Sequence, residues 1–470
     1  MRLLPAALLL VAALSISNRA FAQSREQALA SAKLAVQFLT DQVADHGGYL
    51  WTYSADLQLR EGEGVVKTAT AWTQPPGTPT IGSAFVRLYT ATGDLQFLMA
   101  ARLAAESLRQ GQMRSGGWQA QIEFEPERRR KWAYRTEPYS AKRKDQSSLD
   151  DDKTQSAIRF LIELDDACNQ TDPTVHEMVV FALDGMLSKG QFASGAFPQV
   201  WTSDAHNRPT APDHASYPDE WPREYPGHNE YWYQATLNDN LAPTVLDTLL
   251  LAHKTYDDSR YIDAAKRLGD FLIAAQLPSP QPAWAQQYND HLHPIWARKF
   301  EPPAVTGGES QGVIDALMRL YVATGNKKYL APVPRALDYL TKSTLPDGTL
   351  ARFYELRTNR PLFFSREYKL TYDDSDVPTH YSFRVPSKLK RLRIRFEALS
   401  GASADQARNA SAKPRRIGDT TIQTILDTQD ARGAWVTSSA MRYHKHTGSS
   451  ISMRETAKNL TLLASYLADK

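Results

Sequence analysis

The sequence has a single cysteine, Cys168, in 470 residues, so it can form no internal disulfide and its fold must depend on its core. After Ile16, no apolar run approaches the length that spans a membrane. The net charge of +3 is too small to indicate nucleic acid as a partner. Disulfide scaffolds, membrane-spanning proteins and nucleic-acid-binding proteins are therefore excluded, whereas a hydrophobic fraction of 42% allows a large core.

The amino terminus has the pattern of a secretory signal. Met1 and Arg2 precede an apolar run that ends at Ile16, and Ala20-Phe21-Ala22 forms a small-residue cleavage site. We expect residues 1–22 to be removed and residues 23–470 to fold as a single domain. The sequence thus predicts a secreted or periplasmic protein without a membrane anchor, which we expect to be a monomer.

A loose internal repeat runs through the chain. LYTATGD (88–94) and LYVATGN (320–326) each close one apolar helical run and open another. Glycine turns followed by aromatic residues recur at roughly 65–90 residue intervals, which fits one helix pair per unit. Because a helical hairpin cannot bury its apolar face alone, the units must stack. The turns occupy residues 47–53, 115–124, 194–201, 282–288, 347–355 and 432–438.

The repeat predicts an all-α fold, an α/α toroid of repeated helical hairpins with short strands and long loops at one mouth. We expect the aromatic residues of four turns, Trp118, Phe197, Trp284 and Tyr354, near that mouth. An open solenoid without a cleft is the alternative.

Two long irregular segments, 125–147 and 202–235, interrupt the repeat, and long loops in compact domains are commonly functional. The second contains six aromatic residues, among them Trp221 and Trp232, which form either a sugar-stacking surface or a small core of the loop itself. Locally basic stretches at 125–145 and 384–394 suit an acidic ligand, although such stretches are usually solvated surface. Residues 375–416 are poor in apolar residues and predict a flexible excursion.

Two polar clusters precede apolar helical runs. Asp150-Asp151-Asp152 stands before the helix expected from Lys153, and Asn238-Asp239-Asn240 stands before the run from Leu241. Adjacent aspartates repel one another, so a cation or a basic neighbour should neutralise them. Oxygen ligands of this kind suit a hard cation or a sugar, whereas helix capping is the simpler explanation.

Further charged residues lie near expected helix starts and among aromatic residues. TGGES (306–310) places Glu309 at the start of a helix, and Trp284–Tyr288 leads to Arg298 and Lys299. Arginines held among aromatic side chains make rigid forks for carboxylates, although a surface cluster is the alternative. The stretch 351–368 contains four such arginines, Arg352, Arg357, Arg360 and Arg366.

Together these stretches resemble the family 10 polysaccharide lyases, the pectic acid lyases, whose motifs they repeat in order over about residues 140–370. The corresponding segments are Asp150–Thr154, Gly195–Gln199, Leu237–Asn240, Ala285–Gln287, Gly307–Ser310 and Arg352–Glu367. Three departures occur. Asp151-Asp152-Lys153 replaces the family's N-G-A, Asn240 replaces an aspartate, and Gln287-Tyr288-Asn289 replaces H-D-E.

The resemblance implies β-elimination on a uronate-containing polysaccharide, with pectate or polygalacturonate as the expected substrate and Ca²⁺ as the expected cofactor. It implies that Asp150 and Asp239 hold the cation, with Asp151 or Asn238 as further ligands. It also implies that Arg366 is the base acting beside Asp150, with Arg360 as the alternative base. Further residues are expected to bind the substrate: Arg298, Lys299, Arg352, Arg360, Asn238, Glu309 and Trp232.

Two other functions remain open from the residues alone. A glycoside hydrolase on the same toroid would use Asp150 or Asp151 as acid and Asp239 as base. A protein that binds a uronate polymer without cleaving it would have lost the metal through the departures above.

Overall fold

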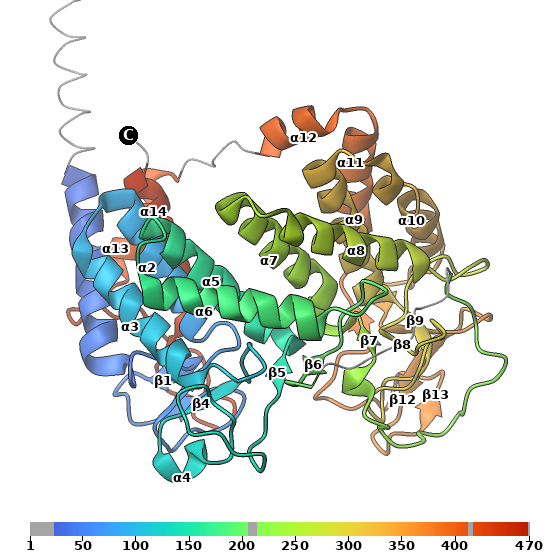
Figure 1. Ribbon diagram of the computed structural model, residues 1–470, viewed down its shortest axis with the longest axis horizontal. Helices are drawn as coiled ribbons and strands as arrows, with labels where there is room; N and C mark the ends of the chain where they lie inside the picture. The colour runs from blue at the N-terminus through green and yellow to red at the C-terminus, as the bar shows by residue number, and fades with distance from the viewer. Residues whose placement is uncertain (1–22, 205–213, 412–416, 469–470) are drawn as a thin grey trace, which may run out of the picture.

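The computed structural model describes residues 23–204, 214–411 and 417–468, so the predicted signal segment 1–22 lies outside the described residues. The described chain is mainly helical, and its strands are only two to four residues long. Figure 1 shows the helix pairs following one another around an arc, which begins with α13 and α14 beside α2 and ends with α11 and α12. The predicted all-α fold, an α/α toroid of repeated helical hairpins, is confirmed.

Helices, including a first one over residues 23–38, account for just under half of the described chain. Their bounds are α2 (Thr78–Thr92), α3 (Leu95–Gly111), α4 (Pro126–Arg129), α5 (Lys153–Ala167), α6 (Pro173–Gly185), α7 (Leu241–Tyr256), α8 (Ser259–Ala274), α9 (Gly307–Thr324), α10 (Val333–Lys342), α11 (Leu389–Ser400), α12 (Ala404–Ser411), α13 (Asp419–Asp427) and α14 (Met453–Ala468). Short 3-10 or π turns are η1 (Leu39–Val43), η2 (Asp150–Asp152), η3 (Met186–Gly190), η4 (Tyr231–Tyr233), η5 (Asn238–Asn240) and η6 (Lys327–Leu330).

The strands join turns that are distant in the sequence. Their bounds are β1 (Thr52–Ser54), β2 (Arg60–Glu61), β3 (Thr70–Trp72), β4 (Gln121–Glu123), β5 (Ser147–Ser148), β6 (Val200–Trp201), β7 (Ala235–Thr236), β8 (Gln287–Tyr288), β9 (Ala304–Thr306), β10 (Leu350–Ala351), β11 (Phe353–Glu355), β12 (Pro361–Phe364), β13 (Leu370–Thr371), β14 (Arg384–Val385), β15 (Val436–Thr437) and β16 (Ser450–Ser452). The larger sheets have the strand orders β15-β16-β1-β2 and β13-β12-β11-β9.

The hairpins that share the repeated LYxATG sequence end their first helix in the same way. Gly93 and Gly325 stop α2 and α9 with φ of 72° and 73°, a left-handed conformation that favours glycine. The next residue then begins the following helix, because Asp94 accepts a hydrogen bond from Gln96 N and Asn326 accepts one from Lys328 N. The repeat therefore encodes a tight turn between two packed helices.

Six helices of the described chain form the inner row of the arc. Contacts run from α14 to α2, α5, α7, α9 and α11, and α3, α6, α8 and α10 cover them from outside. Each inner helix is preceded by a short strand that pairs with a strand of a glycine turn, as β5 pairs with β6 and β7 with β8. The amino-terminal ends of the inner helices are consequently presented on the same side as the strands (Figure 1).

The aromatic residues of the glycine turns anchor those turns to the helices before them. Trp118 Nε1 donates to Leu108 O at 2.8 Å, and Trp284 Nε1 donates to Leu272 O at 2.7 Å. The turns lie on the predicted face, but the four side chains expected at the mouth are at most 1% exposed. These side chains, Trp118, Phe197, Trp284 and Tyr354, therefore close the core beneath this face and do not offer a surface to a sugar.

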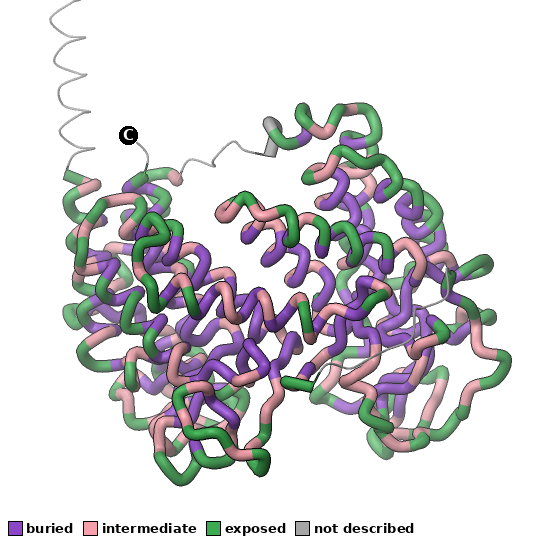
Figure 2. The backbone as a smooth tube through the Cα atoms, in the orientation of Figure 1, coloured by how far each residue is buried: buried purple, intermediate pink, exposed green. Residues whose placement is uncertain are grey.

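Figure 2 shows the buried positions concentrated along the inner helices and beneath the strands. A second, smaller apolar cluster lies under the β9, β11 and β12 strands and contains Trp296, Phe300 and Phe353. Among the described residues, no helix combines the length and the apolar character needed to cross a membrane.

One prediction about the fold is wrong. The composition of residues 375–416 predicts a flexible excursion, but residues 384–411 contain β14, α11 and α12, and residues 412–416 lie outside the described part of the chain. Leu389, Leu392 and Leu399 of α11 are buried although the helix is rich in arginine and lysine. Three leucines spaced along one helical face are enough to dock a helix whose composition is otherwise polar.

Candidate metal and uronate site

The two polar clusters adopt the same backbone conformation before α5 and α7. Asp151 has φ 47° and ψ 37°, and Asp239 has φ 50° and ψ 38°. The residues that follow, Asp152 and Asn240, are also left-handed, with φ of 63° and 58°. Outside glycine, aspartate and asparagine are the residues that adopt this conformation most readily. Asp152 and Asn240 occupy the N-cap positions without making a side-chain cap bond, so capping does not explain either cluster.

The preceding strands hold both turns at equivalent places. Leu149 N donates to Gln199 O, and Leu237 N donates to Gln286 O, both at 2.8 Å. The leucine side chains are buried, at 0% and 2% exposure, so each turn is fixed from below. The inner helices α5 and α7 pack side by side and bring the two turns into contact.

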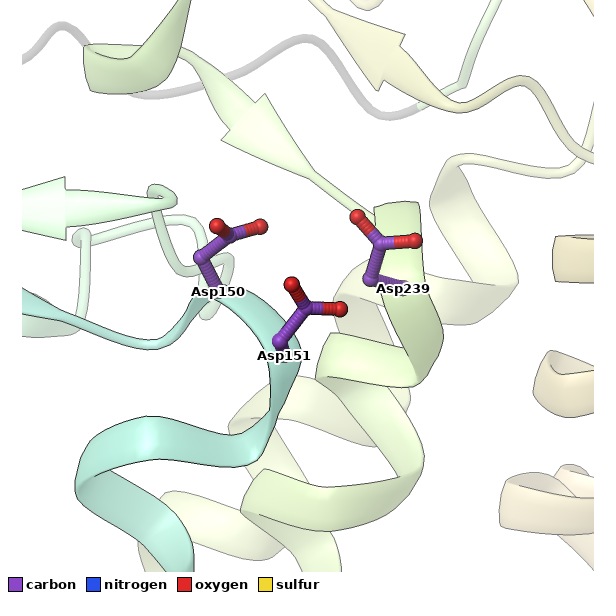
Figure 3. A group of neighbouring side chains, drawn as sticks. All are labelled: Asp150, Asp151 and Asp239. Carbon is purple, nitrogen blue, oxygen red and sulfur yellow. The ribbon is translucent and has the colours of Figure 1, made fainter. Parts of the chain in front are cut away.

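Three carboxylates converge where the turns meet. Asp150 and Asp151 come from η2 and Asp239 from η5, and Figure 3 shows their side chains on neighbouring helix starts. One oxygen of each lies within 4.8 Å of the others, so the group can hold a metal ion. The predicted approach of Asp150 and Asp239, which lie on different inner helices, is confirmed.

Asp150 is the best neutralised of the three. Its Oδ2 accepts a hydrogen bond from Lys153 Nζ at 2.6 Å, and its Oδ1 accepts one from Gln199 Nε2 at 2.7 Å. Burial opposes ionisation, but Lys153 and Gln199 together lower the pKa of Asp150 below its usual value. Asp152 is paired in a similar way with Arg159, whose Nη2 lies 2.6 Å from its Oδ2. Lys153 and Arg159 thus provide ion-pair partners for two of the three consecutive aspartates, although burial still raises the pKa of Asp152.

The charged forms of Asp151 and Asp239 are disfavoured by burial and by the neighbouring carboxylates. Burial and the charge of Asp150 raise the pKa of Asp151 to about 6. Burial and the charges of Asp151 and Asp150 raise the pKa of Asp239 to about 8. Their hydrogen bonds come from the neutral amides of Gln74, at 3.0 Å, and Asn238, at 2.7 Å. A divalent cation between these carboxylates would remove the repulsion that keeps them protonated.

The surrounding polar groups fit a hard cation. Asn238 Oδ1 and both polar atoms of the Gln286 side chain are buried and have no hydrogen-bond partner among the described residues. Ca²⁺ accepts carboxylate and amide oxygens at about 2.3–2.6 Å, and oxygens on opposite sides of one ion then lie about 5 Å apart. Asp150, Asp151 and Asp239 would supply the charge, and Asn238 an uncharged oxygen.

A third inner helix adds an acid, which lies beside an arginine between β10 and β11. Glu309, in the first turn of α9, is 6% exposed, and its Oε1 lies 3.8 Å from Arg352 Nη1. Burial raises the pKa of Glu309, an effect that Arg352 opposes. Arg352 also donates to Ser382 O at 2.7 Å and lies over the ring of Tyr381, 4.6 Å from its centroid. These contacts fix the guanidinium beside α9.

Arg298 is held by a two-point contact. Its Nε and Nη2 donate to the two oxygens of Glu301, at 2.8 and 2.5 Å, and Tyr381 donates to Glu301 Oε1 at 2.9 Å. Burial disfavours its charge, but the bonds to Glu301 raise the pKa of Arg298 above its usual value. Asp239 contributes to the electrostatic environment of both Arg298 and Arg352, so two charged arginines lie on the α9 side of the acidic group.

Comparison with known proteins identifies a family over the part of the chain that contains the acidic group. Residues 112–322 match the pectic acid lyase family. The resemblance predicted from the motifs is thereby confirmed, and the matched region contains Asp150, Asp151, Asp239, Arg298 and Glu309. No curated protein matches the chain.

Solved structures with a similar course of chain include family 10 polysaccharide lyases from Cellvibrio cellulosa. A mutant of that lyase in complex with trigalacturonic acid is 19% identical, with 69% of this chain and 98% of that chain covered and a TM-score of 0.46. A second structure of that lyase is 19% identical, with 68% and 97% covered and a TM-score of 0.47. Cellobiose 2-epimerase from Bacillus thermoamylovorans is 14% identical, with 95% and 99% covered and a TM-score of 0.46.

The predicted arginines of the 351–368 stretch lie beyond the part that matches the pectic acid lyases. Arg352 precedes β11, and Phe353 of that strand pairs with Leu362 of β12. Arg366 lies at the tip of the β12–β13 hairpin, where its side chain is 68% exposed and pairs with Asp376 at 3.1 Å. The structure therefore brings Arg352 to the acidic group and leaves Arg366 on the exposed hairpin tip. The predicted role of Arg366 as the base is not tested by these positions.

The remaining predicted substrate residues contact aromatic side chains. Lys299 is exposed with its Nζ 3.5 Å from the Tyr368 ring centroid, and Arg360 is exposed and lies 3.4 Å from the Tyr372 centroid. Trp232, in η4, is partly buried among aromatic neighbours, which are His228, Tyr231 and Tyr233. Their predicted roles in substrate binding stay predictions.

Sequence analysis missed three residues that shape the site. Tyr381 contacts both arginines and Glu301, but it lies in the stretch predicted to be flexible. Lys153 neutralises Asp150, and Gln199 donates a hydrogen bond to it. Lys153 is three residues after Asp150, and this spacing on a helix start is a signal for an ion pair. Nothing local to residue 381 identifies its role.

Proposed function

We propose that the chain is a secreted polysaccharide lyase that cleaves a uronate-containing polysaccharide, of the pectate or polygalacturonate type, by β-elimination. The observation that carries the proposal is the meeting of three carboxylates with two fixed arginines at adjacent inner-helix starts. The match of residues 112–322 to the pectic acid lyases supports the broader assignment as a polysaccharide lyase.

The chemistry requires a neutralised uronate carboxylate. In β-elimination the C5–H bond breaks, its electron pair forms the C4–C5 double bond, and the glycosidic oxygen leaves C4 and takes up a proton. Negative charge develops on the carboxylate at C5, so positive charge near it stabilises the transition state. Ca²⁺ bound by Asp150, Asp151 and Asp239 supplies such charge when present.

The arginines are suited to hold the uronate. A carboxylate can accept two parallel hydrogen bonds from a guanidinium, and a preformed fork loses little entropy on binding. Arg298 is oriented by Glu301, and Arg352 by Ser382 and Tyr381. We assign both arginines to the substrate carboxylates. We assign the predicted residues Asn238 of η5 and Glu309 of α9 to substrate binding as polar neighbours of these arginines.

The base is proposed to be Arg366, with Arg360 as the alternative predicted from the sequence and Arg298 as a third candidate. A base acts within hydrogen-bond reach of its proton, and Arg366 would have to leave Asp376 to approach a bound sugar. Arg298 already faces the acidic group, but its pairing with Glu301 favours the charged form. The three assignments predict different losses on substitution.

A single set of variants tests both the function and the base. Elimination is followed by the ultraviolet absorbance of the unsaturated product on polygalacturonate, with Ca²⁺ or EDTA. Alanine variants of Arg366, Arg298 and Arg360 are compared with Arg357→Ala, an exposed arginine of the 351–368 stretch. The base variant should abolish turnover and retain binding of a uronate oligomer, whereas loss of binding marks a carboxylate fork. Formation of reducing ends without ultraviolet absorbance would show a glycoside hydrolase and overturn the proposal.

A further inference from the structure

A pocket of about 450 Å³ lies beside the arginine side of the site. One wall is the segment 218–234, which precedes β7, and the other is the segment 289–303, which joins β8 to β9. Its volume falls in the range of roughly 300–1,000 Å³ typical of small-ligand sites. Among the described residues that line it, none is a predicted metal ligand or one of the arginines Arg298 and Arg352.

The pocket is fixed to the elements that carry the site. Gln287 Nε2, in β8, donates to Tyr231 O at 3.1 Å, and β8 pairs with β7 just before η5. On the other wall, Trp296 stands two residues before Arg298 and donates its Nε1 to Pro222 O at 2.8 Å. Burial is the main cause that raises the pKa of Tyr231 to about 12, and the charges of the neighbouring site contribute. The pocket is therefore adjacent to the acidic group and its arginines.

The walls are aromatic and carry little charge. Trp221 and Trp296 lie with their centroids 6.3 Å apart, and Trp221 is only partly buried. Apolar faces of pyranose rings pack on such aromatic surfaces, and polar groups at the edge fix the ring by hydrogen bonds. Such polar groups line this pocket: His228, Asn229, Asn289 and His293.

The described pocket lining lacks the lysine or arginine that would bind a uronate carboxylate. Among the described residues that line it, Glu220 is the only acidic or basic side chain apart from two histidines. Arg223 lies outside this lining; its guanidinium carbon is 4.4 Å from the centroid of the Trp221 ring, and it forms an ion pair with Glu355. A carboxylate bound there would lose its hydration and gain no lysine or arginine that is not already paired with an acid. The arginines that can hold carboxylates, Arg298 and Arg352, belong to the neighbouring site.

We propose that this pocket binds an uncharged pyranose unit of the substrate, adjacent to the uronate that undergoes elimination. The inference rests on the proposed lyase function and specifies its substrate as a polymer in which uronates alternate with, or are interspersed by, uncharged units. Such a unit is either a neutral sugar of the backbone or a uronate whose carboxylate is methyl-esterified. Both present an uncharged ring to Trp221.

Three polymers distinguish the possibilities. Elimination rates are measured on a uronate homopolymer, on the same polymer partly methyl-esterified, and on a polymer that alternates a uronate with a neutral sugar. The wild type should have its highest kcat/KM on one of the two polymers with uncharged units, and the preferred polymer identifies the source of the unit. A wild type that prefers the homopolymer to both others overturns the inference.

Two variants test the pocket itself. Trp221→Ala should lower kcat/KM on the preferred polymer about tenfold and change it less than about twofold on the homopolymer. Trp132→Ala, a partly buried tryptophan in a different loop, is the matched control and should change neither. Equal losses on all polymers, in a Trp221→Ala variant that unfolds at the same temperature as wild type, would contradict the assignment.

Glu220→Lys gives a test that does not depend on an aromatic core. Glu220 is exposed, so the variant should fold, and the new ammonium should raise kcat/KM on the homopolymer several-fold relative to the preferred polymer. Glu224→Lys, also exposed in the same loop but outside the pocket lining, should leave the ratio unchanged. An unchanged ratio in Glu220→Lys would overturn the charge argument.

Calorimetry separates failure of the inference from failure of the lyase function. A neutral or esterified oligosaccharide should bind wild type and bind Trp221→Ala at least several-fold more weakly, whether or not any polymer is cleaved. Binding without ultraviolet-absorbing product would overturn the lyase function alone. Elimination on the homopolymer with no binding of the uncharged oligosaccharide would overturn the pocket alone.

Discussion

The turns before α5 and α7 have the same backbone conformation but differ in how their carboxylates are paired. In Asp150–Asp152, Lys153 and Arg159 each neutralise one aspartate. In Asn238–Asn240, the flanking residues are uncharged amides, and Asp239 has no ion pair among the described residues. Two of the three aspartates of the first turn therefore have ion-pair partners, whereas Asp239 of the second turn has none in the described chain, and a bound cation can relieve its repulsion by Asp150 and Asp151. The same backbone conformation thus carries two ion-paired aspartates before α5 and, before α7, one aspartate that is available as a metal ligand.

The largest expected effect comes from removing the charge of the second turn. Asp239→Asn should lower the elimination rate on the order of 100-fold or more, because it removes the charge of the proposed cation ligand whose pKa is raised most. The measurement is the ultraviolet absorbance of the product at saturating Ca²⁺. Asp257→Asn is a matched control, since Asp257 is a left-handed residue (φ 52°) at the other end of α7. A variant with more than about a tenth of the wild-type rate would show that Asp239 is dispensable.

The pH dependence of stability should separate the two turns next. In metal-free protein, the pKa of Asp239 is about 8 when folded and about 3.9 when unfolded. Between these values the native state binds more protons, so the free energy of unfolding should fall as pH rises from about 5 to 8. We expect a fall on the order of 1–3 kcal/mol, allowing for solvent screening, by chemical denaturation in EDTA.

The control for this prediction is the variant that cannot titrate. Asp239→Asn should flatten most of the pH dependence and should be more stable than wild type at about pH 8 in EDTA. Adding Ca²⁺ should stabilise wild type more than the variant. An equal pH slope in both proteins would assign the effect to other groups.

A smaller effect is expected from making the first turn resemble the second. Lys153→Met leaves Asp150 without its ammonium partner, so metal-free protein should lose about 1–3 kcal/mol of stability. The loss of one positive charge beside Asp150 should at the same time tighten Ca²⁺ binding about tenfold. Calorimetric titration and thermal unfolding measure both, with Lys254→Met, an exposed lysine of α7, as control. Weaker Ca²⁺ binding would show that Lys153 organises the site rather than competing with the ion.

The smallest effect should come from adding charge to the second turn. Asn240 corresponds to Asp152 and is exposed, with its side chain close to Gly312 of α9. Asn240→Asp should keep the left-handed conformation, change stability by less than about 0.5 kcal/mol, and strengthen Ca²⁺ binding by roughly two- to fivefold. Titration of the metal-free variant with Ca²⁺ checks this, and an unchanged affinity would place the ion away from residue 240.

The hairpins and the acidic group are predictable from the sequence because their causes are local. The glycine and the capping residue of each LYxATG repeat specify a turn, and the aspartate clusters stand at helix starts that a toroid brings to one side. The position of Arg366 depends on where the β12–β13 hairpin turns, which no spacing rule gives. Tyr381 reaches both arginines only through the tertiary packing of its segment.

The burial of the turn aromatics shows the same limit. The repeat correctly places Trp118 and Trp284 on one face, but their side chains point into the core, because each indole N–H satisfies a carbonyl at the end of the preceding helix. A periodic aromatic residue indicates where a turn lies. It does not indicate whether the ring faces solvent, because that depends on whether a carbonyl at the end of the preceding helix can accept a hydrogen bond from the ring.

The hydrogen bonds that the tryptophans of these turns donate also have a consequence for how substrate specificity can change. The indoles of Trp118 and Trp284 fix the start of a connection, and the paired strand before the next inner helix fixes its end. The connections between these fixed ends differ in length, since one comprises residues 124–146 and the other residues 289–303. Doubling the length of a loop costs only about 0.6 kcal/mol in closure entropy. Segments that shape a ligand pocket can therefore be lengthened, shortened or grafted from a relative while the helical frame keeps its stability.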